Sequence, residues 1–139
     1  MKLLRVGQPG QEKVAVMDLE NKIRDLSSHI DDLNPDTINF KTLERLKKIK
    51  VETLPEISKS ARIGPCVNRP SNILCIGLNY SLHAEQTGSK LPDNPIVFNK
   101  SPDCLQGPND PIKKSKSQEK LDYEVELAVV IGKEANNID

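Results

Sequence analysis

Two glutamates near the end of the sequence have a spacing that suits metal chemistry. Glu124 and Glu126 stand in the alternating stretch Leu121–Lys133. Successive side chains of a strand point to opposite faces, so a strand here would place these two carboxylates side by side. Neighbouring carboxylates repel unless a cation lies between them, and a hard divalent cation is the usual one. From the pattern alone, the alternative is a half-buried strand with a solvated acidic face. The opposite face of the expected strand is apolar and consists of Tyr123, Val125, Leu127, Val129 and Ile131.

A histidine follows the end of another expected strand. The residues 72–77 predict a buried strand, and 81–87 predict one or two helical turns, with Asn79 or Ser81 as the cap. His83 lies on these turns, in a position where loops commonly carry functional groups. By itself, such a histidine is more typical of a packed or solvated residue than of a catalyst.

Lysines occur at two places that could bind an anion. Lys100 follows a predicted strand over residues 96–98, where it could bind an anionic ligand or extend into solvent. A basic run without aromatic residues comes later, and it is more typical of a solvated loop than of a phosphate-binding groove: Lys113, Lys114, Lys116 and Lys120. The sequence contains no glycine-rich nucleotide-binding motif.

The first half of the chain predicts a small α/β unit. Strands are expected over residues 2–6 and 13–17. A helix is expected over residues 35–49, with Asn34 as its N-cap. Its apolar stripe should pack on the core, and it consists of Phe40, Leu43, Leu46 and Ile49. We place a domain boundary after residue 65, so that residues 1–65 form a small N-terminal domain and residues 66–139 begin a second one.

The composition excludes several classes of protein. Twenty basic and 20 acidic residues cancel, and only two Phe, two Tyr and no Trp are present, which argues against binding of nucleic acid. No apolar run is long enough to span a bilayer, and no signal peptide is recognisable. The three cysteines show no Cys-x-x-Cys spacing, which favours reduced thiols. We therefore expect a cytoplasmic protein without a membrane partner.

Four motifs in order resemble one family. They are Cys75-Ile76-Gly77-Leu78-Asn79-Tyr80-Ser81-Leu82-His83-Ala84, Pro95-Ile96-Val97-Phe98-Asn99-Lys100, Gly107-Pro108-Asn109-Asp110 and the stretch Asp122–Lys133. Together they resemble the fumarylacetoacetate hydrolase family of C–C bond hydrolases and related 2-oxo acid enzymes. The opening residues and the helix after Asn34-Pro35 are similar to the small N-terminal domain of bacterial members. The resemblance implies a mixed α/β (α+β) fold, in which the small domain is followed by the first part of a β-rich catalytic fold.

The resemblance also implies a set of site residues. Glu124 and Glu126 would bind Mg²⁺, Mn²⁺ or Ca²⁺, which acts as a Lewis acid on the carboxylate and 2-oxo group of a diketo acid substrate. His83 would be the general base that activates water. The substrate-binding residues would be Asn79, Tyr80 and Lys100. Family members are commonly dimeric, so we expect a homodimer.

The sequence departs from the family pattern at two points. Many members have a glutamate three residues after the histidine, but here that residue is Gln86, which can orient an imidazole without stabilising its charged form. Members also take a third metal ligand, an aspartate, from a later segment, and Asp139 lies too close to the glutamate pair to serve. We therefore expect a truncated catalytic domain. The alternatives to a hydrolase are a family decarboxylase, isomerase or hydratase, and an inactive remnant with a structural or interaction role.

Overall fold

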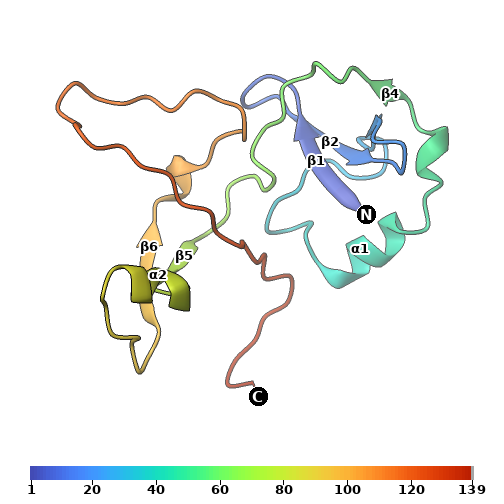
Figure 1. Ribbon diagram of the computed structural model, residues 1–139. Helices are drawn as coiled ribbons and strands as arrows, with labels where there is room; N and C mark the ends of the chain where they lie inside the picture. The colour runs from blue at the N-terminus through green and yellow to red at the C-terminus, as the bar shows by residue number, and fades with distance from the viewer. Residues whose placement is uncertain (139) are drawn as a thin grey trace. The chain divides into compact units, whose positions relative to one another are not determined.

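A computed structural model describes residues 1–138 and combines short helices with two antiparallel sheets (Figure 1). The mixed α/β fold class predicted from the sequence is confirmed. Contacts between residues divide the chain into two units. Unit 1 consists of residues 1–68 together with the chain from Gln106 onwards, and unit 2 consists of Arg69–Leu105. The domain boundary after residue 65 stays a prediction.

Unit 1 is built on a four-stranded antiparallel sheet with the order β1-β2-β3-β4. Its strands are β1 (Lys2–Val6), β2 (Lys13–Met17), β3 (Ile23–Asp25) and β4 (Glu56–Ile57). The first two strands have the bounds that the sequence predicted. They pair in full register from Lys2 opposite Met17 to Val6 opposite Lys13, since the turn between them is short.

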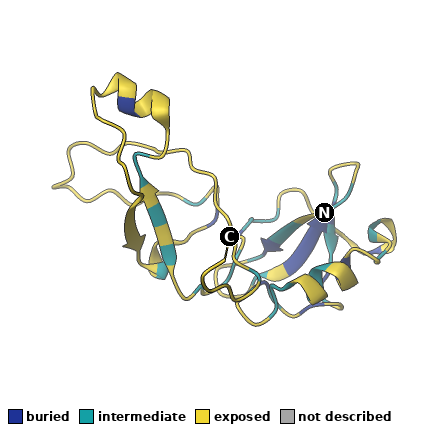
Figure 2. Cartoon of the chain, turned by 90° about the horizontal axis from the view of Figure 1, so that it is seen from below, coloured by how far each residue is buried: buried dark blue, intermediate teal, exposed yellow. Residues whose placement is uncertain are grey.

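The hydrophobic core lies in unit 1. Its main cluster consists of Val14, Val16, Leu26, Ile30, Leu33, Leu46 and Leu54. Figure 2 shows buried residues mainly on the strands and loops of this unit, whereas the elements of unit 2 are largely exposed. Four of these side chains are less than 2% exposed, so unit 1 has a packed interior.

The helix expected over residues 35–49 is shorter in the structure. Helix α1 spans Phe40–Leu46, and a 3₁₀ turn, η1, follows at Val51–Thr53. Asn34 does not cap this helix, because its side-chain oxygen accepts hydrogen bonds from the backbone N–H groups of Asp36 (2.9 Å) and Thr37 (3.1 Å) in a separate turn. The N-cap is Asn39, which is extended (φ −151°, ψ 165°) and accepts from the N–H of Thr42. An asparagine in this conformation begins a new helix and ends the preceding turn.

The apolar stripe of α1 is buried over only part of its length. Leu46 is fully buried and Ile49 packs against the core, as predicted. Phe40 is 65% exposed, so its placement in the core was wrong. It is the first residue of the short helix, whose one buried residue is Leu46.

Unit 2 is a hairpin with a short helix between its strands. Strand β5 (Ile73–Gly77) pairs antiparallel with β6 (Ile96–Lys100), helix α2 spans Ser81–Gln86, and the 3₁₀ turn η2 spans Pro102–Cys104. The strands and the helix confirm the predicted elements. Strand β5 is not buried, however, because Leu74 is 68% exposed and Ile76 is 42% exposed. A two-stranded sheet offers no second layer that could cover both of its faces.

Residues 121–131 form no strand, which corrects the central prediction from the sequence pattern. A strand is stabilised by hydrogen bonds to a neighbouring strand, and within residues 1–138 no strand pairs with this segment. Its expected apolar face is exposed to solvent, from 75% at Val129 to 85% at Tyr123 and Leu127. Alternation of polar and apolar residues describes how side chains partition once a sheet exists, and it does not supply the partner strand.

None of the helices within residues 1–138 is long and apolar enough to cross a lipid bilayer.

Candidate functional site

The connection between β5 and α2 contains a strained residue. Leu78 has φ +51°, a left-handed conformation that is unusual for a residue with a branched side chain. Directly before it, Gly77 packs against Ile96 so closely that a Cβ would lie 3.3 Å from its side chain. Strained backbone of this kind persists where the surroundings fix it, and it is common at functional sites. The connection therefore sets where Asn79 and Tyr80 leave the sheet.

Tyr80 is the N-cap residue of helix α2, and its side chain makes no capping hydrogen bond. The carbonyl of Tyr80 accepts from the backbone N–H groups of His83 (3.1 Å) and Ala84 (3.2 Å). The cap that we predicted at Asn79 or Ser81 was therefore wrong. Only Ala84 of this helix is buried, so α2 rests on its alanine and presents its other side chains to solvent.

His83 is exposed on α2 and accessible to a small molecule. Gln86 lies three residues later, which places it on the same side of a helix. The backbone carbonyl of His83 accepts a hydrogen bond from the hydroxyl of Thr87 (2.9 Å). The roles of both residues stay predictions.

Lys100 lies at the opposite end of the hairpin from α2. In the register of the sheet, Lys100 pairs with Ile73 at the start of β5, whereas Gly77 at its end pairs with Ile96. Four residues along a strand correspond to about 13 Å. A substrate that contacts both His83 and Lys100 must therefore extend along the hairpin or use the length of the lysine side chain. The role of Lys100 stays a prediction.

Glu124 and Glu126 belong to unit 1, whereas His83 belongs to unit 2. Both glutamates are exposed on the extended segment described above. Neither is isolated, since Glu124, Glu126, Asn79 and Lys100 each take part in an interaction within the chain.

The carboxylates of Glu124 and Glu126 are the type of ligand that a hard divalent cation prefers. Carboxylate oxygens are the ligands that Mg²⁺, Mn²⁺ and Ca²⁺ prefer, and Mg²⁺ often uses one or two carboxylates together with water and substrate. The number of possible ligands is small, because the described part of the chain brings no group of three or more His, Cys, Asp or Glu residues together. Asp139, which we expected not to be a ligand, lies outside the described residues. Glu124 and Glu126 could thus hold a cation only with additional oxygen ligands.

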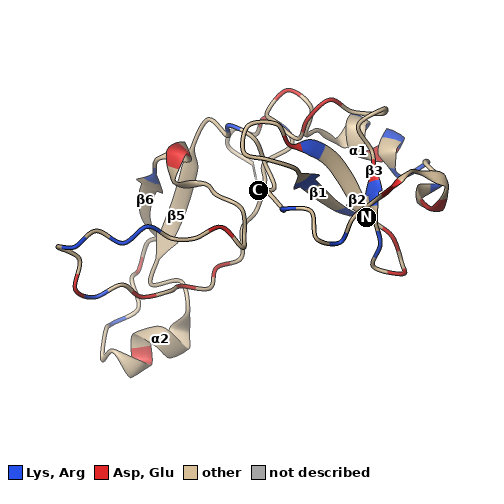
Figure 3. Ribbon diagram, turned by 90° about the horizontal axis from the view of Figure 1, so that it is seen from above, with Lys and Arg blue, Asp and Glu red and all other residues tan. Residues whose placement is uncertain are grey.

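Sequence reasoning missed a charged network in unit 1. Arg5, on β1, is only 4% exposed and donates from Nε to Asp32 Oδ1 (2.6 Å) and from Nη2 to Asp32 Oδ2 (3.2 Å). Its Nη2 also lies 3.4 Å from Oε2 of Glu12, and Oε1 of Glu12 accepts from Arg62 Nη1 (2.9 Å). Figure 3 shows acidic and basic residues next to each other around β1 and β2. The one available signal was an arginine inside a strand, between Leu4 and Val6.

The network extends to two further residues. Arg62 donates from Nε to Asp110 Oδ1 (2.8 Å) and from Nη2 to Oδ2 (2.5 Å). Asn68 donates its amide N–H to Asp32 Oδ2 (2.7 Å). Within residues 1–138, no buried side-chain nitrogen or oxygen is left without a hydrogen bond, which is the condition under which buried charge is tolerated.

These contacts lower the pKa of all three carboxyl groups. Burial, the largest single influence, would raise the pKa of Glu12 and Asp32. Hydrogen bonds, chiefly from Arg62 to Glu12 and from Arg5 to Asp32, and the positive charge of Arg5 together outweigh it. For Asp110, the hydrogen bond from Arg62 is the largest influence and lowers its pKa against burial. Each group is therefore more acidic in the folded chain than in the unfolded one.

We predict that acid destabilises the chain through these groups. A depressed folded-state pKa contributes stability that is present above the ordinary value, which is 4.5 for Glu12 and 3.8 for Asp32 and Asp110, and is lost as the pH falls through the folded values. The free energy of unfolding, measured with urea, should therefore decrease between about pH 5 and about pH 3. The double variant Glu12→Gln, Asp32→Asn should show a smaller decrease. If the free energy of unfolding fell equally with pH in the unmodified chain and in the double variant, these carboxyl groups would not be the cause of the acid destabilisation.

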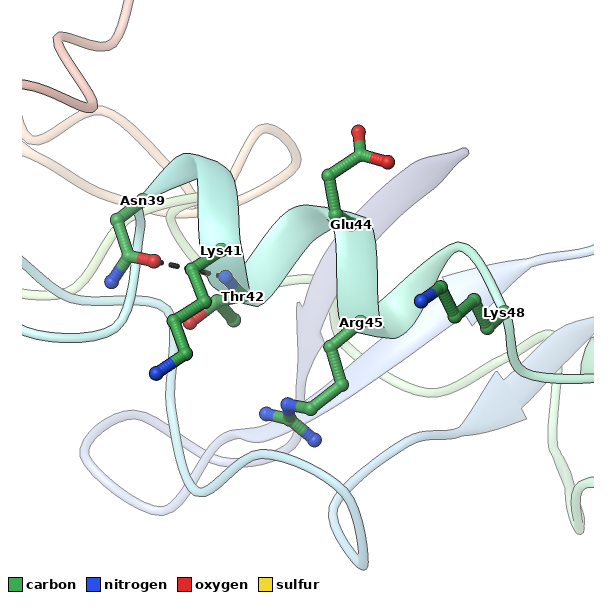
Figure 4. Close-up of a pocket in the computed structure, with 6 residues that line it drawn as sticks. All are labelled: Asn39, Lys41, Thr42, Glu44, Arg45 and Lys48. Atoms are coloured by element: carbon green, nitrogen blue, oxygen red, sulfur yellow. Dashed lines mark hydrogen bonds between the residues drawn. The ribbon is translucent and has the colours of Figure 1, made fainter.

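A shallow surface hollow lies along α1 (Figure 4). It is lined by Asn39, Lys41, Thr42, Glu44, Arg45 and Lys48. The only hydrogen bond drawn among these residues is the N-cap contact from Thr42 N–H to Asn39 Oδ1, at 2.9 Å. Long charged side chains on a helix of seven residues form a solvated face. We assign no chemistry to it.

Comparison with known proteins identifies the class. The model of the fumarylacetoacetate (FAA) hydrolase C-terminal family matches residues 72–139, the part of the chain that contains His83, Lys100 and both glutamates. Residues 72–139 therefore belong to the fumarylacetoacetate hydrolase family.

Individual relatives agree with this assignment. A protein of Burkholderia multivorans named putative hydrolase is 46% identical over 139 residues, which is 100% of the chain and 49% of the relative. A protein of Burkholderia ambifaria with a similar name has the same identity and coverage. One of Burkholderia cenocepacia is 45% identical, again over 49% of its own length. The chain thus spans about half the length of the curated relatives it matches.

Proposed function

We propose that the chain is part of a metal-dependent hydrolase that cleaves a C–C bond in a diketo acid of the acylpyruvate type. The observation that carries this proposal is the family match over residues 72–139, which covers the histidine and the glutamate pair together. The exposed position of His83 after the strained Leu78 supports it. The proposal includes a homodimer.

The proposed roles follow from the chemistry of each side chain. Glu124 and Glu126 would hold a divalent cation, Mg²⁺, Mn²⁺ or Ca²⁺, through their carboxylate oxygens. A bound cation would supply electrostatic stabilisation for the negative charge that develops on the 2-oxo acid. Asn79, Tyr80 and Lys100 would bind the substrate, and the ammonium group of Lys100 would pair with its negative charge.

His83 would act on water. Its neutral imidazole takes a proton from the water molecule, while the water oxygen bonds to the distal carbonyl carbon. The C–C bond then breaks, and its electron pair stays on the carbon that belongs to the 2-oxo acid fragment. That carbon takes up the proton that His83 accepted from water. The products are a carboxylic acid and a 2-oxo acid. Gln86 would orient the imidazole from the next helical turn.

The experiment that tests the proposal measures Mn²⁺ binding to the 139-residue chain by calorimetry. The double variant Glu124→Gln, Glu126→Gln should abolish the binding, because each substitution removes an anionic oxygen ligand and preserves shape. The double variant Glu119→Gln, Glu134→Gln is the matched control, since it changes the charge equally and should leave the affinity unchanged. Equal affinity of both double variants would refute the assignment of the ligands.

A second candidate function is a non-catalytic structural or interaction role. It is favoured by one observation: within residues 1–138, no cluster of three possible metal ligands exists. Mn²⁺-dependent turnover of an acylpyruvate by the chain would exclude this candidate. Decarboxylation of a 2-oxo acid without C–C hydrolysis would indicate a related reaction on the same residues, as would isomerisation or hydration.

A further inference from the structure

The turn at residues 107–110 is attached to the N-terminal part of unit 1 by a forked ion pair. Both nitrogens on one edge of the Arg62 guanidinium donate to Asp110, at 2.8 Å and 2.5 Å. The two side chains are each about one-fifth exposed, 22% for Arg62 and 21% for Asp110. A bidentate pair of this kind fixes orientation as well as distance.

Arg62 is held in place by other residues before it meets Asp110. Its Nη1 donates to the carbonyl oxygen of Gly7 (3.0 Å) and to Oε1 of Glu12 (2.9 Å), which is 3% exposed. The backbone of Arg62 accepts from the N–H of Gly7 (3.0 Å). The loop between β1 and β2 therefore orients the guanidinium so that the edge formed by Nε and Nη2 faces Asp110.

The turn itself fits closely onto the chain beside Arg62. Gly107 is buried, and a Cβ at this position would collide with the carbonyl oxygen of Ile63. The N–H of Gly107 donates to Asp110 Oδ2 (2.9 Å), and the N–H of Asp110 donates to the carbonyl of Gly107 (3.1 Å). Only a glycine permits this approach, so residues 107–110 dock as one unit.

The segment with the two glutamates begins at this attachment point. Beyond Asp110, residues 111–131 contain neither helix nor strand. A Cβ on Gly132 would lie 3.8 Å from the carbonyl oxygen of Ile38 and 3.9 Å from Cα of Asn39. The segment thus belongs to unit 1, and Gly132, directly after it, lies beside Ile38 and Asn39.

We propose that Arg62 and Asp110 form a clamp that positions the segment 111–131, so that both are positioning residues for Glu124 and Glu126. The effect on metal binding rests on the proposed function, whereas the docking of residues 107–110 does not. Without the clamp, the turn loses its charged attachment, and the segment loses a fixed point at its start. The clamp thus links the small N-terminal part of the chain to the expected metal ligands.

The test uses the full 139-residue chain and the variants Asp110→Asn and Arg62→Lys. An asparagine removes the negative charge, and a lysine cannot donate to Glu12, Gly7 and Asp110 in the same fork. Hydrogen exchange measured by mass spectrometry should show the amides of residues 107–110 exchanging about tenfold faster or more in both variants. Calorimetry should show weaker Mn²⁺ binding in both.

Asp18→Asn is the matched control. Asp18 accepts from Arg24 (2.9 Å) and from the N–H groups of Lys22 (2.8 Å) and Glu20 (2.9 Å), and its side chain is 2% exposed. It therefore resembles Asp110 chemically but lies in the turn between β2 and β3. This variant should speed exchange in that turn and leave both residues 107–110 and the Mn²⁺ affinity unchanged.

Each result decides a separate statement. Unchanged exchange at residues 107–110 in Asp110→Asn and Arg62→Lys would overturn the clamp. Faster exchange with an unchanged Mn²⁺ affinity would overturn its positioning role. If the unmodified chain binds no Mn²⁺, the proposed metal site is wrong, and the exchange result alone then decides whether the clamp exists.

Discussion

Replacing Arg5 with leucine is expected to lower the free energy of unfolding by about 3–5 kcal/mol. The guanidinium is 4% exposed and faces Asp32, Glu12 and the carbonyl oxygen of Pro65. Leucine removes the cation, which leaves Asp32 without its main partner and takes from Glu12 one of its two arginines. The penalty is that of uncompensated charge in a poorly solvated place, which exceeds the net value of the ion pair itself. Urea unfolding followed by circular dichroism measures the change.

Two comparisons separate this effect from a general loss of an arginine. Arg45→Leu removes an exposed arginine with one hydrogen bond, to the carbonyl of His29 (2.8 Å), and should change stability by no more than about 0.5 kcal/mol. The triple variant Arg5→Leu, Glu12→Gln, Asp32→Asn should recover part of the loss, since it also removes the stranded charges. A triple variant that is less stable than Arg5→Leu would contradict this explanation.

Replacing Leu46 with alanine is expected to destabilise the chain by about 2–5 kcal/mol. Leu46 is 0% exposed and is the one buried residue of α1. Its side chain packs in the cluster with Val14, Val16 and Leu26. Alanine has the highest helix propensity, so the loss cannot come from the helix itself and must come from the cavity and the lost burial. The same unfolding measurement applies.

Leu19→Ala is the matched control for Leu46→Ala. Leu19 is 97% exposed, so the same chemical change there should alter stability by no more than about 0.5 kcal/mol. Similar losses in the two variants would show that α1 does not pack on the sheet as described.

The chain's charged network shows why the sequence alone predicts some features and not others. Strands β1 and β2 are predictable because their pairing residues are close in sequence and the turn between them is short. Arg62 and Asp110 are 48 positions apart, and Arg5 and Asp32 are 27 apart. No local pattern marks such pairs, since each residue alone is typical of a solvated surface.

The expected site was predictable in its residues and not in its geometry. His83 and the helix that carries it follow from local signals, namely a strand end and a short helix after it. The distance of Lys100 from α2 follows only from the register of β5 and β6, in which Ile73 lies opposite Lys100. A pairing register depends on two segments at once, so one segment's pattern cannot fix it.

For Glu124 and Glu126, the sequence by itself determined the residue types, their spacing and, through the four ordered motifs, the family. Only the tertiary structure decided that residues 121–131 are exposed and form no strand, and that Asp110 ties the start of this segment to Arg62. The physical reason is that side-chain chemistry is carried by each residue alone. Pairing, burial and charge compensation instead require a partner, and the fold determines which partner is near.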